Sequence, residues 1–121
     1  MTVLRLRILF DEAMLGPGKA ELLERIGQTG SISAAGRQMN MSYKRAWMLV
    51  EEMNRAFRDP LVSSTRGGPG GGGAELTEAG KRVLGLYHRI VETATMASAE
   101  SLASLEAMLR PADAPDMSAE K

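Results

Sequence analysis

The hydrophobic and polar positions of the chain change their period several times, and each change marks a predicted element. Side chains alternate between apolar and charged from residue 4 to residue 8, and Phe10 continues this period of two, which is typical of a half-buried strand. From about residue 19 to residue 28 the period becomes helical, and Gly30 follows as the residue that ends the helix. A second, shorter helix is predicted from a cap at Ser31 or Ser33 to about Met39.

A third and longer helix is predicted to begin after Ser42, a good N-cap, and to reach about Arg58, where Asp59-Pro60 stops it. Its apolar residues recur at helical spacing on one face: Ala46, Leu49, Val50, Met53 and Phe57. Two helices joined by a tight break at residues 40–41, the second longer and amphipathic, have the layout of a helix-turn-helix.

The second half of the chain predicts a hairpin followed by a helix. Residues 61–63 and 74–76 look like short strands, and the glycine-rich segment 66–73 forms the tip between them. Thr77 is the predicted cap of a last helix over 77–109. Its apolar stripe is too long for a domain of this size to cover, so we expect a partner chain.

The predicted fold is therefore mainly α with a small β wing: a winged helix-turn-helix with a long C-terminal dimerisation helix. We expect one domain over residues 1–110 and a disordered tail over 111–121.

Composition narrows the classes of function. The chain has no cysteine, which excludes disulfides and thiolate metal sites, and its one histidine cannot build a multi-histidine site. No catalytic constellation is present, so we expect no enzyme, no metal and no cofactor. No apolar run approaches the roughly 20 residues that span a membrane, and we expect a cytoplasmic protein.

Charge argues only weakly against a nucleic-acid partner. The formal net charge is +0. The last eleven residues hold three acidic side chains and one lysine, so the remainder of the chain is slightly basic. Whether the chain binds a nucleic acid must therefore be judged from where its charges lie.

The start of the third helix has the residues that such a helix needs in a major groove. Ser42 and the first backbone N–H groups can hold a phosphate, Lys44 and Arg45 can reach guanine or phosphate, and Tyr43 can donate to phosphate or pack on a sugar. Two interpretations of Trp47 remain open: a surface residue beside Tyr43, or a core residue between the helices. An ordinary solvated face also remains a competing explanation for the charged side chains.

The glycine-rich segment does not fit a nucleotide-binding loop, because Gly80-Lys81 is followed by Arg82 and not by serine or threonine. It fits a wing whose backbone approaches DNA closely while Arg66 supplies charge. A connector that contacts nothing is the alternative.

Two stretches resemble the DNA-binding domain of ModE-type molybdate-responsive transcription regulators. They are residues 30–36, GSISAAG, and residues 41–47, MSYKRAW. The string Glu52-Met53-Asn54 and the glycine loop followed by LTEAG at 76–80 resemble the same family, and the likeness extends from about Leu6 to Ile90. A more distant likeness is to the LysR-type helix-turn-helix.

The resemblance implies a cytoplasmic homodimer on a palindromic operator, with dimer contacts through the first strand and helix and the last long helix. The candidate DNA-binding residues are Ser33, Ser42, Tyr43, Lys44, Arg45, Trp47, Arg66, Gly67 and Gly68. The candidate dimer residues are Leu6, Ile8, Leu22, Ile90, Ala94, Ala97, Leu102 and Leu105.

Full-length members of that family have C-terminal domains that bind molybdate or tungstate, and this chain ends before one could form. We therefore expect a regulator of molybdenum-related genes that corresponds to the N-terminal winged helix-turn-helix domain only and does not bind molybdate itself. The alternative is a dimeric interaction module that pairs with another regulator or with an oxyanion-binding protein.

Overall fold

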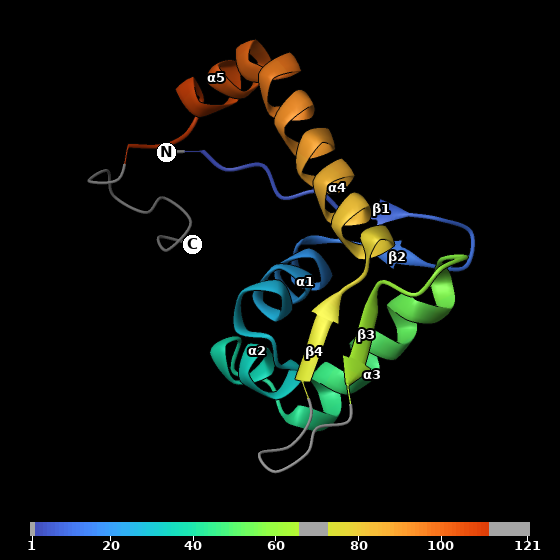
Figure 1. Ribbon diagram of the computed structural model, residues 1–121. Coiled ribbons are helices and arrows are strands. Elements are labelled where there is room, and N and C mark those ends of the chain that lie inside the picture. Colours follow the sequence, from blue (N-terminus) through green and yellow to red (C-terminus); the bar gives the residue numbers. More distant parts are fainter. Residues whose placement is uncertain (1, 66–72, 112–121) are drawn as a thin grey trace.

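The computed structural model describes residues 2–65 and 73–111, which form helices and two small antiparallel hairpins (Figure 1). In chain order the elements are β1 (Ile8–Leu9), β2 (Met14–Leu15), α1 (Pro17–Thr29), α2 (Ile32–Gln38), α3 (Tyr43–Ala56), β3 (Val62–Thr65), β4 (Gly73–Leu76), α4 (Glu78–Ala97) and α5 (Ala99–Ala107). The mainly helical fold with a small two-stranded wing is as predicted.

Helices α1, α2 and α3 enclose the main core together with the β3–β4 hairpin (Figure 1). The large side chains buried most completely are Leu22, Leu23, Ile26, Val50, Met53 and Leu61. The inward stripe predicted for α3 lies in or against this core. The prediction that Leu22 contacts a partner chain is wrong, because its side chain is 0% exposed within the single chain and has no surface left to offer.

The turn between α2 and α3 is tight and brings the two helices close together. Asn40 has a φ of 58°, a left-handed conformation that asparagine tolerates better than most residues. A Cβ added to Gly36 in α2 would lie 2.9 Å from the Cβ of Ala46 in α3. Glycine at position 36 therefore lets α2 approach α3 and fixes how α3 projects from the core.

Hydrogen bonds anchor the β3–β4 hairpin on both sides. The Asn54 side chain in α3 accepts from the backbone N–H groups of Leu61 (2.8 Å) and Val62 (3.1 Å) and donates to the Val62 carbonyl (3.1 Å). On β4, the Ala74 N–H donates to the carbonyl of Gly30, at the junction of α1 and α2, over 2.9 Å. The hairpin is thus held beside the helix-turn-helix.

The first strand is much shorter than the alternation of residues 4–10 predicts. Only Ile8 and Leu9 pair, with Leu15 and Met14 of a returning strand that the sequence did not predict. The earlier residues run along α4 instead, where the Tyr87 hydroxyl donates to the Leu6 carbonyl over 2.5 Å. That contact takes the place of a sheet partner.

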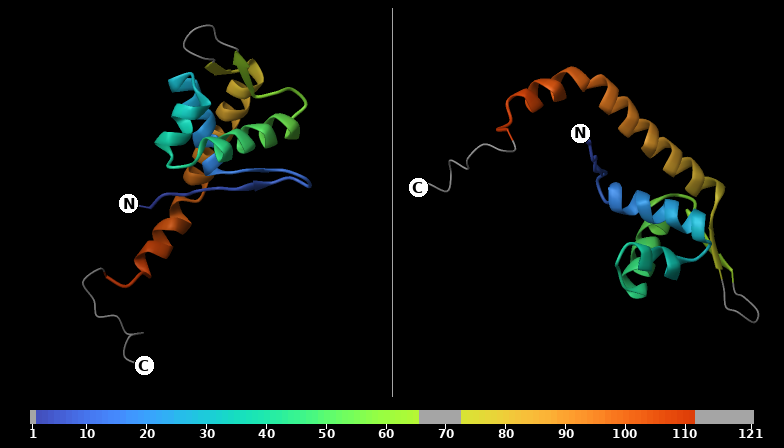
Figure 2. Two further views of the ribbon diagram at one scale, coloured as in Figure 1. Left: turned by 90° about the horizontal axis from the view of Figure 1, so that it is seen from below. Right: turned by 90° about the vertical axis from the view of Figure 1, so that its left-hand side faces the viewer.

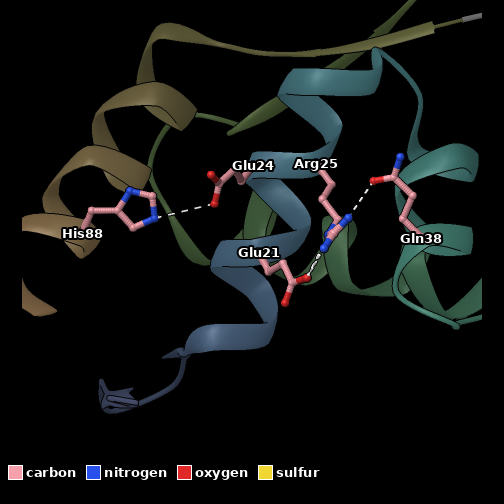
Figure 3. Close-up of polar contacts among 5 residues, drawn as sticks. All are labelled: Glu21, Glu24, Arg25, Gln38 and His88. Carbon is pink, nitrogen blue, oxygen red and sulfur yellow. Dashed lines mark hydrogen bonds and ion pairs between the residues drawn. The ribbon is translucent and has the colours of Figure 1, made fainter. Parts of the chain in front are cut away.

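Polar contacts join helix α1 to α2 and to α4 (Figure 3). The His88 Nε2 atom of α4 lies 3.8 Å from the Glu24 carboxylate, and Arg25 donates to the Gln38 side chain of α2 over 2.8 Å. A small second core of Leu15, Ala20 and Tyr87 packs α4 against the N-terminal elements.

The single helix predicted over 77–109 is divided at Ser98. Both the backbone N–H of Ser98 (3.0 Å) and its hydroxyl (2.6 Å) donate to the Ala94 carbonyl, and the residue has left regular helical geometry with ψ at 10°. Serine hydroxyls that bond back to the preceding turn often bend helices, in accord with an interruption at this residue. Beyond it α5 continues, and both views of Figure 2 show the far end of α4 and α5 extending away from α1–α3.

Candidate nucleic-acid interface

The N-terminal end of α3 is an exposed and well-capped helix start. As predicted, Ser42 is the N-cap, and its hydroxyl accepts from the Arg45 N–H over 3.1 Å. Tyr43 is 57% exposed, and Lys44 and Arg45 are also exposed. Three side chains able to donate hydrogen bonds therefore lie together at the end of the helix where the dipole favours anions.

The charge of α3 changes sign along its length. Within residues 2–65 and 73–111, no ion pair joins Lys44 or Arg45 to a carboxylate. The acids later in the helix are compensated, since Glu52 pairs with Lys19 at 3.2 Å and Glu51 lies 4.0 Å from Arg55. The uncompensated positive charge of α3 is therefore at its start.

Trp47 lies at the surface and does not fill the core between the helices. Its side chain is 38% exposed and lines a hollow of about 250 Å³ between α2, α3 and the β3–β4 hairpin. Tyr43, one turn earlier, lines the same hollow, and Ser33 enters it from α2. The fold thus places the start of α3, the start of α2 and the hairpin around one surface.

Two further residues of this surface, Ser64 and Thr65 on β3, were not among the predicted site residues. A signal was present, because Ser63-Ser64-Thr65 is an uninterrupted polar run directly after buried Val62. Only the hairpin's position beside α3 shows that Ser64 and Thr65 line this hollow. The predicted wing residues Arg66, Gly67 and Gly68 lie outside the described residues.

Tyr87, whose pKa is clearly altered, lies away from this surface. Burial raises the pKa of the Tyr87 hydroxyl, and the positive charge of Arg5 partly opposes that rise.

In the described ranges no group of three acidic, histidine or cysteine side chains could hold a metal ion. No helix of those ranges is both long and apolar enough to cross a membrane.

Comparisons with known proteins agree with this geometry. The profile of the bacterial regulatory helix-turn-helix proteins, lysR family, matches residues 18–81. The chain is 46% identical over 78 residues to the molybdenum-pterin-binding protein MopB of Rhodobacter capsulatus, covering 64% of this chain and 29% of MopB. It is 41% identical over 76 residues to the DNA-binding transcriptional dual regulator ModE of Escherichia coli K12, covering 63% of this chain and 29% of ModE. The chain thus spans less than a third of the length of these relatives.

Among solved structures, the crystal structure of the CbnR_DBD-DNA complex superposes with a TM-score of 0.56 at 22% identity, covering 73% of this chain and 95% of that chain. At that identity the likeness concerns the fold, a winged helix-turn-helix. The winged helix-turn-helix of this chain is 38–46% identical to the ModE and Mop proteins and is therefore of the ModE type. The match over residues 18–81 covers more than half of the chain, which therefore belongs to the lysR family of bacterial regulatory helix-turn-helix proteins.

Proposed function

We propose that this protein is a transcription regulator that inserts the start of α3 into the major groove of duplex DNA. The observation that carries the proposal is the pair of exposed cations, Lys44 and Arg45, that have no carboxylate partner in the described part of the chain. They follow a capped helix start, where a helix-turn-helix protein places its base-contacting residues. Tyr43 and Trp47 flank them and suit sugar and phosphate contacts.

The genes under control are, in this proposal, related to molybdenum. MopB is a molybdenum-pterin-binding protein, and ModE is a DNA-binding transcriptional regulator. Both are similar to the helix-turn-helix region of this chain. The match covers 29% of each, so the properties of the rest of those proteins do not transfer. We expect molybdate to leave the DNA affinity of these 121 residues unchanged. Such a regulator acts in the cytoplasm.

The direct test is selection of binding sites from a pool of random 30-bp duplexes, followed by titration of the enriched duplex at several salt concentrations. Replacing Lys44 and Arg45 together by alanine should weaken binding by about 1–3 kcal/mol for each residue that reads a base. For each phosphate that the variant no longer touches, the slope of log K against log salt should fall by about 1. The matched control removes the same charge from exposed positions of α4, as Arg82→Ala/Arg89→Ala.

Equal binding by the wild type and the Lys44→Ala/Arg45→Ala variant, with both folded, would remove this assignment. A chain that enriched no sequence from the pool would count against any sequence-specific role. That result would favour the alternative function, a dimeric interaction module that pairs with another protein without binding DNA.

We further propose that two copies act together on a palindromic operator. Apolar side chains remain exposed on α4 and α5, with Ile90 at 44% and Leu105 at 62%. Ala94 and Leu102, also predicted as dimer residues, are partly exposed on the same two helices, and Ala97 is exposed. Two-fold symmetry of the protein would be mirrored by two-fold symmetry of the site.

Mass measurement by light scattering after gel filtration tests this part. We expect twice the chain mass of 13.0 kDa for the wild type and a shift toward the single mass for Ile90→Asp/Leu105→Asp. A wild-type chain that has a mass of 13.0 kDa without duplex and forms a complex of one chain per duplex with it would contradict the dimer but not DNA binding.

A further inference from the structure

The hollow beside Trp47 is built largely from hydroxyl groups that come from separate elements. Ser31 and Ser33 belong to the cap and first turn of α2, and Ser64 and Thr65 belong to β3. No residue that lines it carries a carboxylate. Its volume of about 250 Å³ is open to solvent on the same face as the start of α3, so a molecule bound along α3 would meet it.

The hydrogen bonds already made by these hydroxyls determine what they can still do. The Ser33 oxygen accepts from the Arg37 guanidinium over 2.8 Å, and the Thr65 oxygen accepts from the Gly73 N–H over 3.1 Å. The Ser31 oxygen likewise accepts from the Ala34 N–H over 3.0 Å. A hydroxyl has one proton to donate besides its acceptor sites, and none of the three donates to another described residue. Each of the three hydroxyls therefore keeps its proton for donation to a ligand, besides one remaining acceptor site.

A ligand that satisfies several convergent O–H donors must present acceptors and few donors. Phosphate oxygens do so, and hydrogen bonds to a charged acceptor are stronger than those to a neutral one. Serine, threonine and tyrosine side chains are among the groups that contact phosphate and sugar in protein–DNA complexes. The rings of Tyr43 and Trp47 line the same hollow and offer apolar surface to a deoxyribose.

From this arrangement we infer that the hollow receives one backbone phosphate and its sugar from the bound duplex, and that neutral hydroxyls rather than cations hold that phosphate. The inference rests on the proposed DNA-binding function. A phosphate seated between α2, α3 and the hairpin would fix the register of α3 along the groove without reading any base. It would also make part of the affinity independent of salt, because a neutral donor releases no counterion.

The experiment compares Thr65→Val, which removes the hydroxyl at constant shape, with Thr65→Ser, which keeps it. The probe is the duplex selected by the wild-type chain. We expect Thr65→Val to weaken binding by about ten-fold with the salt slope unchanged, whereas Thr65→Ser should bind like the wild type. Ser63→Ala is the matched control, because Ser63 neighbours these residues on β3 but does not line the hollow. Far-UV circular dichroism confirms that each variant is folded.

Replacing single phosphates of the duplex by uncharged methylphosphonates locates the contact. At one position in each half-site the wild type should lose affinity, and Thr65→Val should lose less than the wild type, because one of the hydroxyls that hold that phosphate is already gone. At other positions, the loss of affinity from the methylphosphonate and the loss from Thr65→Val should add. Trp47 is the only tryptophan of the chain, so its emission should change when the unmodified duplex binds and should not respond to inorganic phosphate alone.

Several results would overturn the inference. Equal affinities of Thr65→Val and Thr65→Ser would show that the hydroxyl holds no phosphate, and a fall in the salt slope of Thr65→Val would point to a cationic contact instead. Additive losses at every methylphosphonate position would show that Thr65 touches no particular phosphate. An emission change with inorganic phosphate alone would indicate a site for a free anion. If Lys44→Ala weakens binding while Thr65→Val does not, the hollow fails and the proposed function stands. If no duplex binds, both fall.

Discussion

Among the glycines in the described part of the chain, Gly80 is the one where adding one methyl group should cost the most stability, and the structure allows the effect to be estimated. Gly80 is buried in the first turn of α4, and a Cβ built on it would lie 2.1 Å from the carbonyl oxygen of Leu61. The same oxygen accepts from the Thr77 N–H over 2.9 Å, and the Thr77 hydroxyl donates to the Pro60 carbonyl over 2.6 Å. These hydrogen bonds hold the start of α4 against residues 60–61, and an added Cβ would push the helix away from the same residues.

One favourable and two unfavourable terms set the magnitude for Gly80→Ala. Alanine favours the helix by up to about 1 kcal/mol over glycine. The clash is with backbone, which cannot rotate away, and overpacking of this kind costs about 1–3 kcal/mol. Displacing α4 also weakens the two hydrogen bonds made by Thr77, each worth about 1 kcal/mol. We expect a net loss of about 2 kcal/mol in the free energy of unfolding.

The same substitution at Gly85, in the same helix, is the control. A Cβ there meets nothing within 4 Å, so Gly85→Ala should gain up to about 1 kcal/mol from helix propensity alone. Gly18→Ala in α1, where the Cβ also meets nothing within 4 Å, is a second control outside α4. The Gly80 and Gly85 variants should thus differ by about 3 kcal/mol, or roughly 10 °C or more in Tm.

Urea unfolding followed by far-UV circular dichroism, at one protein concentration for all variants, measures these differences. The reasoning would be refuted if Gly80→Ala were as stable as Gly85→Ala. Such a result would mean that α4 is not fixed against Leu61 as the hydrogen bonds of Thr77 indicate.

Two further variants test other contacts of the fold. Asn54→Ala removes the side chain that bonds the backbone of Leu61 and Val62, and should lower the free energy of unfolding by about 2 kcal/mol in the same urea titration. Tyr87→Phe removes the bond to the Leu6 carbonyl and should cost about 1 kcal/mol. Because the pKa of Tyr87 is raised in the folded chain, the neutral hydroxyl stabilises the fold below pH 10, and that contribution disappears as the pH rises through the folded pKa. Above pH 10 the wild type should therefore lose stability faster than Tyr87→Phe, and parallel pH profiles would contradict this.

The features that the sequence predicts correctly are those decided within a few residues. Ser42 and Thr77 cap α3 and α4 with bonds to an N–H three residues ahead, so the whole interaction lies inside one short window. The inward stripe of α3 follows from helical period in the same way. Helix-turn-helix and wing were predictable because each is a succession of such local signals.

The predictions that failed depend on neighbours far away in the chain. Leu22 has the pattern of any apolar helix residue, and only the packing of α1 against α2 and α3 shows that it is enclosed. The alternation of residues 4–10 would suit a strand, yet the bond from Tyr87 to Leu6 joins residues 81 positions apart and turns that segment along α4. Serine at position 98 is compatible with a continuous helix, and its hydroxyl instead bonds back to Ala94.

Trp47 shows why the site itself could not be completed from sequence. Its spacing from Tyr43 put both rings on one flank of α3, but whether that flank faced core or solvent depended on what packs beside it. In the structure the neighbours are Ser33 of α2 and Thr65 of β3, which lie 14 and 18 residues away, and they leave the indole partly exposed. A large apolar ring surrounded by hydroxyls is poorly placed to stabilise a core, because the hydroxyls would then be buried without acceptors. The same surroundings are well suited to a sugar and a phosphate, which give the ring an apolar face and the hydroxyls their acceptors.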